Sequence, residues 1–133
     1  MSEVILDASA LLAVLRRERG CDVVEAVLTG ATVSAVNYSE VVKKSVEAGG
    51  QARETRVLLR LMALVVAPFD ESQAFEAGAL FSRTEVSGLS FADRACLALG
   101  LLRKWPVLTT DRRFAEVGLP VEVRVIRRAG SVH

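Results

Sequence analysis

The sequence has few of the residues that mark disulfide-stapled, zinc-binding or histidine-dependent proteins. Its 133 residues include two cysteines and one histidine. Cys21 and Cys96 are far apart and lie among aliphatic residues, where a free cysteine usually packs as a small apolar side chain. The histidine is the terminal His133, so we do not expect a catalytic histidine. Because no His or Cys pair has metal-ligand spacing, the sequence argues against a zinc site.

Long apolar runs are also missing. The longest candidates, residues 61–69 and 95–102, are much shorter than the roughly 20 residues that a membrane-spanning helix needs. The first residues show no basic segment followed by an apolar stretch, which a secretory signal would require. We therefore expect a cytoplasmic protein with reduced thiols and no membrane segment.

Aromatic residues make up only 5% of a sequence that is 51% hydrophobic, so the core must be built mainly from alanine, valine and leucine. The sequence shows no internal repeat, low-complexity tract or linker, and its length fits one domain, to which we assign residues 1–133. The formal net charge of +1 neither predicts nor excludes a nucleic-acid partner, because acids committed to a metal would leave a basic surplus elsewhere.

What the sequence does have is an alternation of strand-like and helix-like segments. The predicted strands cover residues 3–6, 32–36, 64–67, 106–109 and 121–126. The predicted helices cover residues 10–15, 23–28, 37–47, 74–81 and 91–103, and one more carries Val57, Leu58, Leu61 and Leu64 on one face. Ser9 and Asn37 are candidate N-caps of the first and third helices. This alternation predicts an α/β domain whose central parallel sheet of four to five strands is covered on both faces.

Four acidic residues occupy equivalent places in this scheme, at strand ends or helix starts. Asp7 directly follows the first strand, and Asp111 follows the fourth. Glu40 and Asp93 lie in the first turns of two helices, one after the second strand and one before the fourth. Ligands of open parallel sheets bind beyond the carboxyl ends of the strands, where helices begin. We therefore expect all four carboxylates on the same rim of the sheet.

Carboxylates brought together in this way repel one another, and a divalent cation relieves the repulsion. Mg²⁺ and Mn²⁺ prefer hard oxygen ligands, and Mg²⁺ usually keeps waters and substrate phosphate oxygens beside a few carboxylates. An acid-only site therefore indicates Mg²⁺ (or Mn²⁺) acting on a phosphate ester. There the metal would lower the pKa of a bound water and stabilise the leaving oxygen.

Each acid also has a local explanation that involves no metal. An aspartate after a strand, such as Asp7, is often only a helix cap. Glu40 follows Asn37 by three residues, which is the spacing of a capping box, and Asp93 follows Ser90 in the same way. The acid of the Thr-Thr-Asp segment could belong to a turn. The expected convergence of all four on one rim favours a shared site over four separate caps.

Four segments around these acids resemble the PIN domain, and specifically the VapC-type toxins of bacterial and archaeal toxin–antitoxin pairs. The segments are residues 4–12 (VILDASALL), 39–41 (SEV), 89–99 (LSFADRACLAL) and 107–114 (VLTTDRRF). They occur in the order typical of the family, and the resemblance extends over nearly the whole chain. The first two are weak signals alone, whereas the two downstream segments are specific.

The resemblance implies a three-layer α/β/α fold and a Mg²⁺- or Mn²⁺-dependent endoribonuclease activity. The residues that match the family's acidic quartet are Asp7, Glu40, Asp93 and Asp111. Ser9 and Thr109 match the small polar residues that support the quartet, and their hydroxyls could orient acids or hold a metal-bound water. A helix cap for Ser9 and a strand-end hydroxyl for Thr109 are equally good explanations.

The resemblance also implies partners. The substrate would be RNA, and a cognate antitoxin would cover the active site with its C-terminal segment, commonly placing a basic residue in the acidic pocket. Toxins of this type tend to form homodimers. In this sequence Arg94, Arg112 and Arg113 adjoin two of the acids, where they could contact RNA phosphates or form ion pairs with neighbouring acids.

Two other functions remain open from the sequence. An aspartyl-phosphate phosphatase would use Asp7 as its nucleophile, but that class needs a second aspartate two residues later, where Ser9 stands. A non-catalytic α/β binding module would use the acids only as caps and surface charges. Ribonuclease activity with added Mn²⁺ separates the three possibilities.

Overall fold

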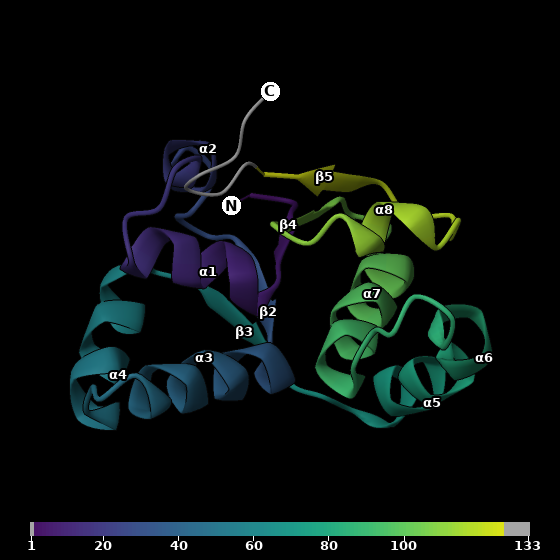
Figure 1. The fold of residues 1–133 in the computed structure, drawn as a ribbon, viewed down its shortest axis with the longest axis horizontal. Coiled ribbons are helices and arrows are strands. Elements are labelled where there is room, and N and C mark those ends of the chain that lie inside the picture. The colour runs from purple at the N-terminus through teal and green to yellow at the C-terminus, as the bar shows by residue number, and fades with distance from the viewer. Residues whose placement is uncertain (1, 127–133) are drawn as a thin grey trace.

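The computed structural model describes residues 2–126, which form a five-stranded sheet flanked by helices (Figure 1). The strands are β1 (Ile5–Leu6), β2 (Thr32–Ser34), β3 (Val65–Ala67), β4 (Val107–Thr109) and β5 (Val123–Val125). Their order is β3-β2-β1-β4-β5, and every neighbouring pair is parallel. The predicted parallel sheet is confirmed. The expectation that concerned His133 lies outside the described residues.

Helices connect the strands, as parallel crossovers require. In the described part of the chain they are α1 (Ala8–Leu15), α2 (Cys21–Glu25), α3 (Ala35–Glu47), α4 (Ala52–Leu61), α5 (Glu71–Ala79), α6 (Phe81–Thr84), α7 (Phe91–Arg103) and α8 (Arg113–Glu116). None of them is both long and apolar enough to cross a membrane. The predicted helix at residues 91–103 matches α7 residue for residue.

The core lies in two layers, one on each face of the sheet. Leu6 and Leu108 pack with residues of α1 to α4 on one face. Their strand neighbours Ile5 and Val107 pack with residues of α5, α7 and α8 on the other face. Because successive side chains of a strand point to opposite faces, adjacent apolar residues in the central strands contribute to both layers. The result is the expected three-layer α/β/α fold.

The apolar face of α4 does not point to the core. Val57, Leu58 and Leu61 share one side of this helix, and such a face is normally the buried one. In the structure they are 53%, 48% and 77% exposed, whereas Thr55 and Leu59 are buried. The predicted face is therefore wrong, and Leu59 is the residue of α4 that joins the core.

Gly100 lets α7 lie directly against β4. A Cβ at this buried position would stand 2.6 Å from Val107 Cγ2 and 3.1 Å from Val121 Cγ2. Both neighbours are β-branched and have little freedom to turn away. We expect Gly100→Ala to lower the free energy of unfolding by about 1–3 kcal/mol through overpacking.

Gly78→Ala in α5 is the matched control, since nothing lies within 4 Å of the Cβ that it would add. It should raise the free energy of unfolding by up to about 1 kcal/mol, because alanine is the better helix former. Urea denaturation measures both variants. Equal effects of the two substitutions would contradict the close approach of α7 to the sheet.

Candidate active site

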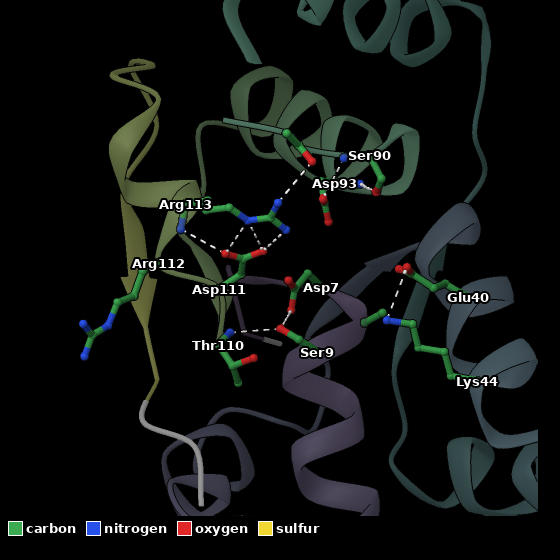
Figure 2. Close-up of a pocket in the computed structure, with 12 residues that line it drawn as sticks. Asp7, Ser9, Glu40, Lys44, Ser90, Asp93, Thr110, Asp111, Arg112 and Arg113 are labelled. Atoms are coloured by element: carbon green, nitrogen blue, oxygen red, sulfur yellow. Dashed lines mark hydrogen bonds and ion pairs between the residues drawn. The ribbon is translucent and has the colours of Figure 1, made fainter. Parts of the chain in front are cut away.

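A pocket of about 590 Å³ opens at the carboxyl ends of β1 and β4 (Figure 2). Its walls come from the ends of these neighbouring strands, from α3 and from the start of α7. The acids that line it are Asp7, Glu40, Asp93 and Asp111. The structure therefore brings together the four carboxylates that the sequence places on one rim.

Asp7 is the most enclosed of the four acids, at 4% exposure. Its Oδ1 accepts hydrogen bonds from the Ala10 amide at 2.9 Å and the Ser9 hydroxyl at 2.7 Å. Its Oδ2 accepts one from the Thr109 hydroxyl at 2.6 Å. The expectation that Ser9 caps the first helix is wrong, because α1 begins at Ala8 and Asp7 is its N-cap. The local cap explanation for Asp7 is thus correct, but it accounts for only one of three bonds.

Burial raises the pKa of Asp7 from its ordinary 3.8 to about 6, because the enclosed carboxylate loses its hydration. Hydrogen bonds from Thr109, Ser9 and Ala10 lower the pKa in part, and the negative charge of Asp93 raises it again. The site therefore holds a carboxylate that three donors orient but do not neutralise. A cation bound between Asp7 and Asp93 would supply the missing positive charge.

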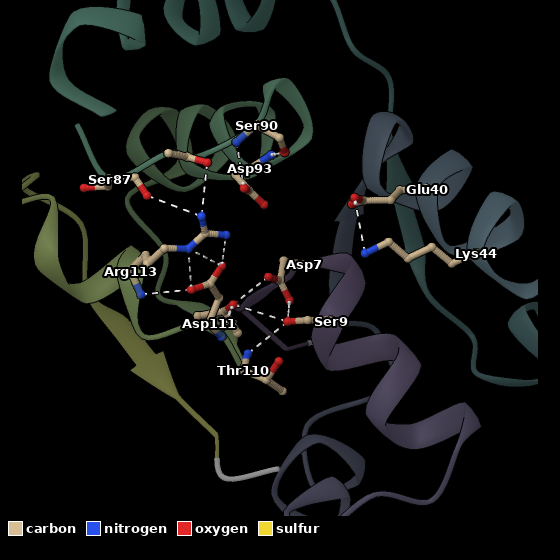
Figure 3. A network of polar contacts seen from close by, with 12 residues as sticks. Asp7, Ser9, Glu40, Lys44, Ser87, Ser90, Asp93, Thr110, Asp111 and Arg113 are labelled. Atoms are coloured by element: carbon tan, nitrogen blue, oxygen red, sulfur yellow. Dashed lines mark hydrogen bonds and ion pairs between the residues drawn. The ribbon is translucent and has the colours of Figure 1, made fainter. Parts of the chain in front are cut away.

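Ser9 and Thr109 connect Asp7 to the end of β4. The Thr109 hydroxyl donates to Asp7 and accepts a hydrogen bond from the Asp111 amide at 3.0 Å. The Ser9 hydroxyl donates to Asp7 and accepts one from the Thr110 amide at 2.9 Å (Figure 3). Both hydroxyls therefore orient the Asp7 carboxylate, whereas Thr109 holds Asp111 through its backbone.

Asp93 forms a capping box at the start of α7. Its amide donates to Ser90 Oγ at 3.2 Å, and its Oδ2 accepts a hydrogen bond from the Ser90 amide at 2.8 Å. The local explanation for Asp93 is therefore correct. It is incomplete, because the same carboxylate lines the pocket and its charge acts on Asp7. The capping box therefore holds the Asp93 carboxylate at the rim, where the other three acids also lie.

Glu40 lies in the second turn of α3, not in the first. Ser34 is the N-cap of that helix, and its hydroxyl accepts a hydrogen bond from the Val36 amide at 3.2 Å, so Asn37 lies inside the helix. The capping-box explanation for Glu40 is therefore wrong. Its Oε2 lies 3.8 Å from Lys44 Nζ at the pocket wall, and the two side chains are 23% and 43% exposed. Such a partly solvated pair is weak.

Asn37 connects the helices that carry two of the acids. It is 1% exposed, and its Nδ2 donates to the Ala92 carbonyl at 3.0 Å, which ties α3 to the first turn of α7. The sequence pattern gave Asn37 the role of a helix cap, since asparagine near a helix start is a common cap. Its real partner is distant in sequence, so no local signal could have revealed the contact.

Asp111 forms an ion pair with Arg113, one of the two possibilities that the sequence leaves open for this arginine. Arg113 Nε lies 3.1 Å from each carboxylate oxygen, and Nη2 lies 2.7 Å from Oδ2. The Arg113 amide also donates to Oδ1 at 2.9 Å. The Arg113 side chain is 47% exposed and that of Asp111 is 25% exposed, so the pair is in contact with solvent.

The four acids suit a hard divalent cation by their chemistry, although they do not form a ready ligand cage. Within residues 2–126, no three acidic, histidine or cysteine side chains already stand as a metal-binding group. Asp7 and Asp93 repel each other, while Lys44 and Arg113 lie against the other two acids. Mg²⁺ and Mn²⁺ fit such an oxygen-only set, because they need few protein ligands and retain waters.

The raised pKa of Asp7 predicts a pH-dependent stability in the metal-free protein. The unfolded chain loses the Asp7 proton at a lower pH than the folded chain does. The contribution of Asp7 to the free energy of unfolding therefore falls by about 3 kcal/mol as the pH rises from about 4 to about 6, and stays level above that range.

Asp7→Asn removes this titration and keeps a side chain that can cap α1. In urea denaturation with EDTA present, the variant should gain stability relative to the wild type as the pH rises through this interval. All other titrating groups are shared, so their contributions cancel in the difference. Parallel pH profiles for the two proteins would contradict the argument from burial.

Solved structures of other proteins share this fold. VapC20 from Mycobacterium tuberculosis, a sarcin–ricin loop cleaving toxin, is 16% identical with a TM-score of 0.73, over 90% of this chain and 98% of that one. VapBC-5 from the same organism is 22% identical with a TM-score of 0.62, and the match covers 94% of this chain and 98% of that one. DNA-bound VapBC from Salmonella typhimurium is 14% identical with a TM-score of 0.73, over 94% and 98%. At these identities the similarity shows the fold alone.

No curated protein sequence matches the chain. The family of PIN domains matches it over residues 4–119, a range that contains all four acids and both supporting hydroxyls. The parallel sheet between two layers of helices and the pocket at its rim agree with the fold that the motifs predict. The resemblance drawn from the motifs is thereby confirmed, and the chain belongs to the PIN domain family.

Proposed function

We propose that this protein is a metal-dependent endoribonuclease of the VapC type, the toxin of a type II toxin–antitoxin pair. The observation that carries the proposal is the pocket in which carboxylates from four separate segments meet. The proposed catalytic and metal-binding residues are Asp7, Glu40, Asp93 and Asp111, supported by Ser9 and Thr109. The fold neighbour VapC20 is a sarcin–ricin loop cleaving toxin, which supports an RNA phosphodiester as the substrate.

The proposed cofactor is Mg²⁺ (or Mn²⁺), held by Asp7 and Asp93, with Asp111 and Glu40 as further oxygen donors. When bound, the metal supplies the positive charge that activates water and stabilises the leaving oxygen. Asp7 contributes a fixed carboxylate, because its three hydrogen bonds keep it from turning away. Since its pKa is raised to about 6, Asp7 would give up its remaining proton when the metal binds.

The rim of the pocket favours a polyanionic substrate. Lys44 lies against Glu40 and Arg113 lies against Asp111, so positive charge stands on two sides of the acids in Figure 2. Basic side chains in such positions contact phosphates that flank the bond to be cut, and they do so without reading the base sequence. A small phosphate ester has no flanking phosphates for these basic side chains to contact.

Neither alternative function accounts for the environment of Asp7. A phosphatase of this class needs a second aspartate two residues after its nucleophile, and the chain has Ser9 at that place. Ser9, at the place of the required second aspartate, directs its hydroxyl to Asp7 itself. A binding module would need its acids only as caps, and a cap has no reason to be desolvated beside another acid.

We further propose that a cognate antitoxin covers the pocket with its C-terminal segment and that the chain forms a homodimer. Two of the fold neighbours are VapBC systems, which supports an antitoxin partner. The homodimer is proposed from the resemblance to VapC-type toxins, which tend to form homodimers.

The ribonuclease proposal predicts that cleavage depends on the buried acid and on the metal. We expect RNA cleavage with added Mn²⁺, and a loss of more than about 100-fold in Asp7→Asn and Asp93→Asn, which exceeds the usual effect of removing a supporting partner. Asp70→Asn is the matched control, because Asp70 caps α5 as Asp7 caps α1 but lies outside the pocket lining. Its activity should equal that of the wild type.

Activity that survives in both Asp7→Asn and Asp93→Asn would contradict the assignment. Release of phosphate from small esters without RNA cleavage would favour the phosphatase. A folded wild type that cleaves neither substrate would favour the binding module.

The hydroxyl of Thr109 should matter through Asp7. Thr109→Val keeps the side-chain shape and removes the donor to Asp7 Oδ2. We expect the Kd for Mn²⁺, measured by calorimetry, to rise by about 10-fold to 100-fold, as for other supporting partners. Thr110→Val makes the same change one residue later, where the amide and not the hydroxyl contacts Ser9. Equal metal affinities in the two variants would contradict the supporting role of Thr109.

A further inference from the structure

The Arg113 side chain joins an active-site acid to the turn that precedes α7 (Figure 3). On one side its Nε and Nη2 contact the Asp111 carboxylate, as described above. On the other side its Nη1 donates to the carbonyls of Ser87 at 3.3 Å and Gly88 at 3.1 Å. One guanidinium thus bridges the loop after β4 and the turn at 85–88.

The backbone at both ends is shaped to receive this side chain. The Arg113 amide donates to Asp111 Oδ1, which holds the carboxylate toward its own arginine. Gly88 has a φ of +72°, a conformation that favours glycine, and a Cβ there would come within 3.4 Å of Arg113 Nη1. The planar fork of arginine matches a carboxylate with two parallel bonds, which makes this the strongest ion pair of the pocket.

The same contact keeps Asp111 from serving as a ready metal ligand. Among the described residues no three acids form a ready ligand group, and Asp111 is directed at a cation that the chain itself supplies. A divalent metal that uses Asp111 must displace the guanidinium or share the carboxylate with it. Because the Arg113 side chain is 47% exposed, its ion pair with Asp111 is partly solvated, and breaking the pair costs little free energy.

We propose that Arg113 is a built-in competitor of the divalent metal: it neutralises Asp111 in the metal-free protein and is displaced when the metal binds. This inference rests on the metal site proposed above. Displacement breaks the bonds from Nη1 to Ser87 and Gly88 as well, so metal binding loosens the turn at 85–88. The released guanidinium stays at the pocket wall, where an RNA phosphate can replace Asp111 as its partner.

The direct test is Mn²⁺ binding by isothermal titration calorimetry, with Arg113→Gln compared with Arg112→Gln. Both substitutions remove one positive charge beside Asp111, but the Arg112 side chain points away from the acids in Figure 2. We expect Arg113→Gln to bind Mn²⁺ about fivefold more tightly than Arg112→Gln, the scale of a partly exposed ion pair. Arg113→Lys, which keeps the charge and loses the fork, should fall between Arg113→Gln and the wild type.

Equal or weaker Mn²⁺ binding in Arg113→Gln than in Arg112→Gln would overturn the competition while leaving the metal site intact. Absence of Mn²⁺ binding in the wild type and in all the variants would overturn the metal site and the competition together. The two failures are therefore distinguishable in one set of titrations.

Hydrogen exchange gives a readout that is independent of affinity. The Gly88 and Leu89 amides bond to Glu85 and Thr84 within the turn that Arg113 restrains. We expect Mn²⁺ to speed exchange at these two amides in the wild type, and we expect them to exchange fast in Arg113→Gln with or without Mn²⁺. Exchange that Mn²⁺ leaves unchanged or slows in the wild type would contradict displacement of the arginine.

Discussion

The buried carboxylate of Asp7 is the feature on which the rest of the site depends. It stands where β1 passes into α1, and its hydrogen-bond donors come from α1 and from the end of β4. Because β1 and β4 are neighbours in the sheet, the carboxylate that caps α1 also holds the two strand ends together, through its separate bond from Thr109. The cost is a desolvated acid beside Asp93. A protein that needed only a helix cap would leave this acid in water, so the arrangement supports the proposal that Asp7 binds a cation.

The other three acids reach the pocket by different physical means. Asp93 is fixed by the capping box of α7, and Glu40 is carried by α3, which Asn37 ties to α7. Asp111 is held through its backbone by Thr109 and through its carboxylate by Arg113. Since the chain's own cations offset two of the acids, the unliganded pocket is less strained than four bare carboxylates would make it. Under the proposed metal site, binding of a divalent metal would therefore exchange one cation for another instead of filling an uncompensated cluster of acids.

Much of this could be predicted from the sequence, because it follows from periodicity and from strand ends. The alternation of strands and helices gave the parallel sheet, and the position of Asp7 and Asp111 directly after strands gave their meeting at one rim. Two predicted N-caps, Ser9 and Asn37, were wrong, since serine, asparagine and aspartate cap about equally well and the choice among neighbours depends on backbone angles that the pattern does not fix. The orientation of the Arg113 side chain could not be predicted either, because it is set by backbone carbonyls 25 and 26 residues away in the sequence.

The central claim is that the rim pocket binds a divalent metal between carboxylates that would otherwise repel. The most direct measurement is anomalous X-ray diffraction from crystals soaked in Mn²⁺, at a wavelength where manganese scatters anomalously. The account predicts a peak in the pocket within bonding distance of the Asp7 and Asp93 carboxylates, with the Arg113 guanidinium turned away from Asp111. A pocket without a peak at saturating Mn²⁺, or an ion bound only outside it, would contradict the account.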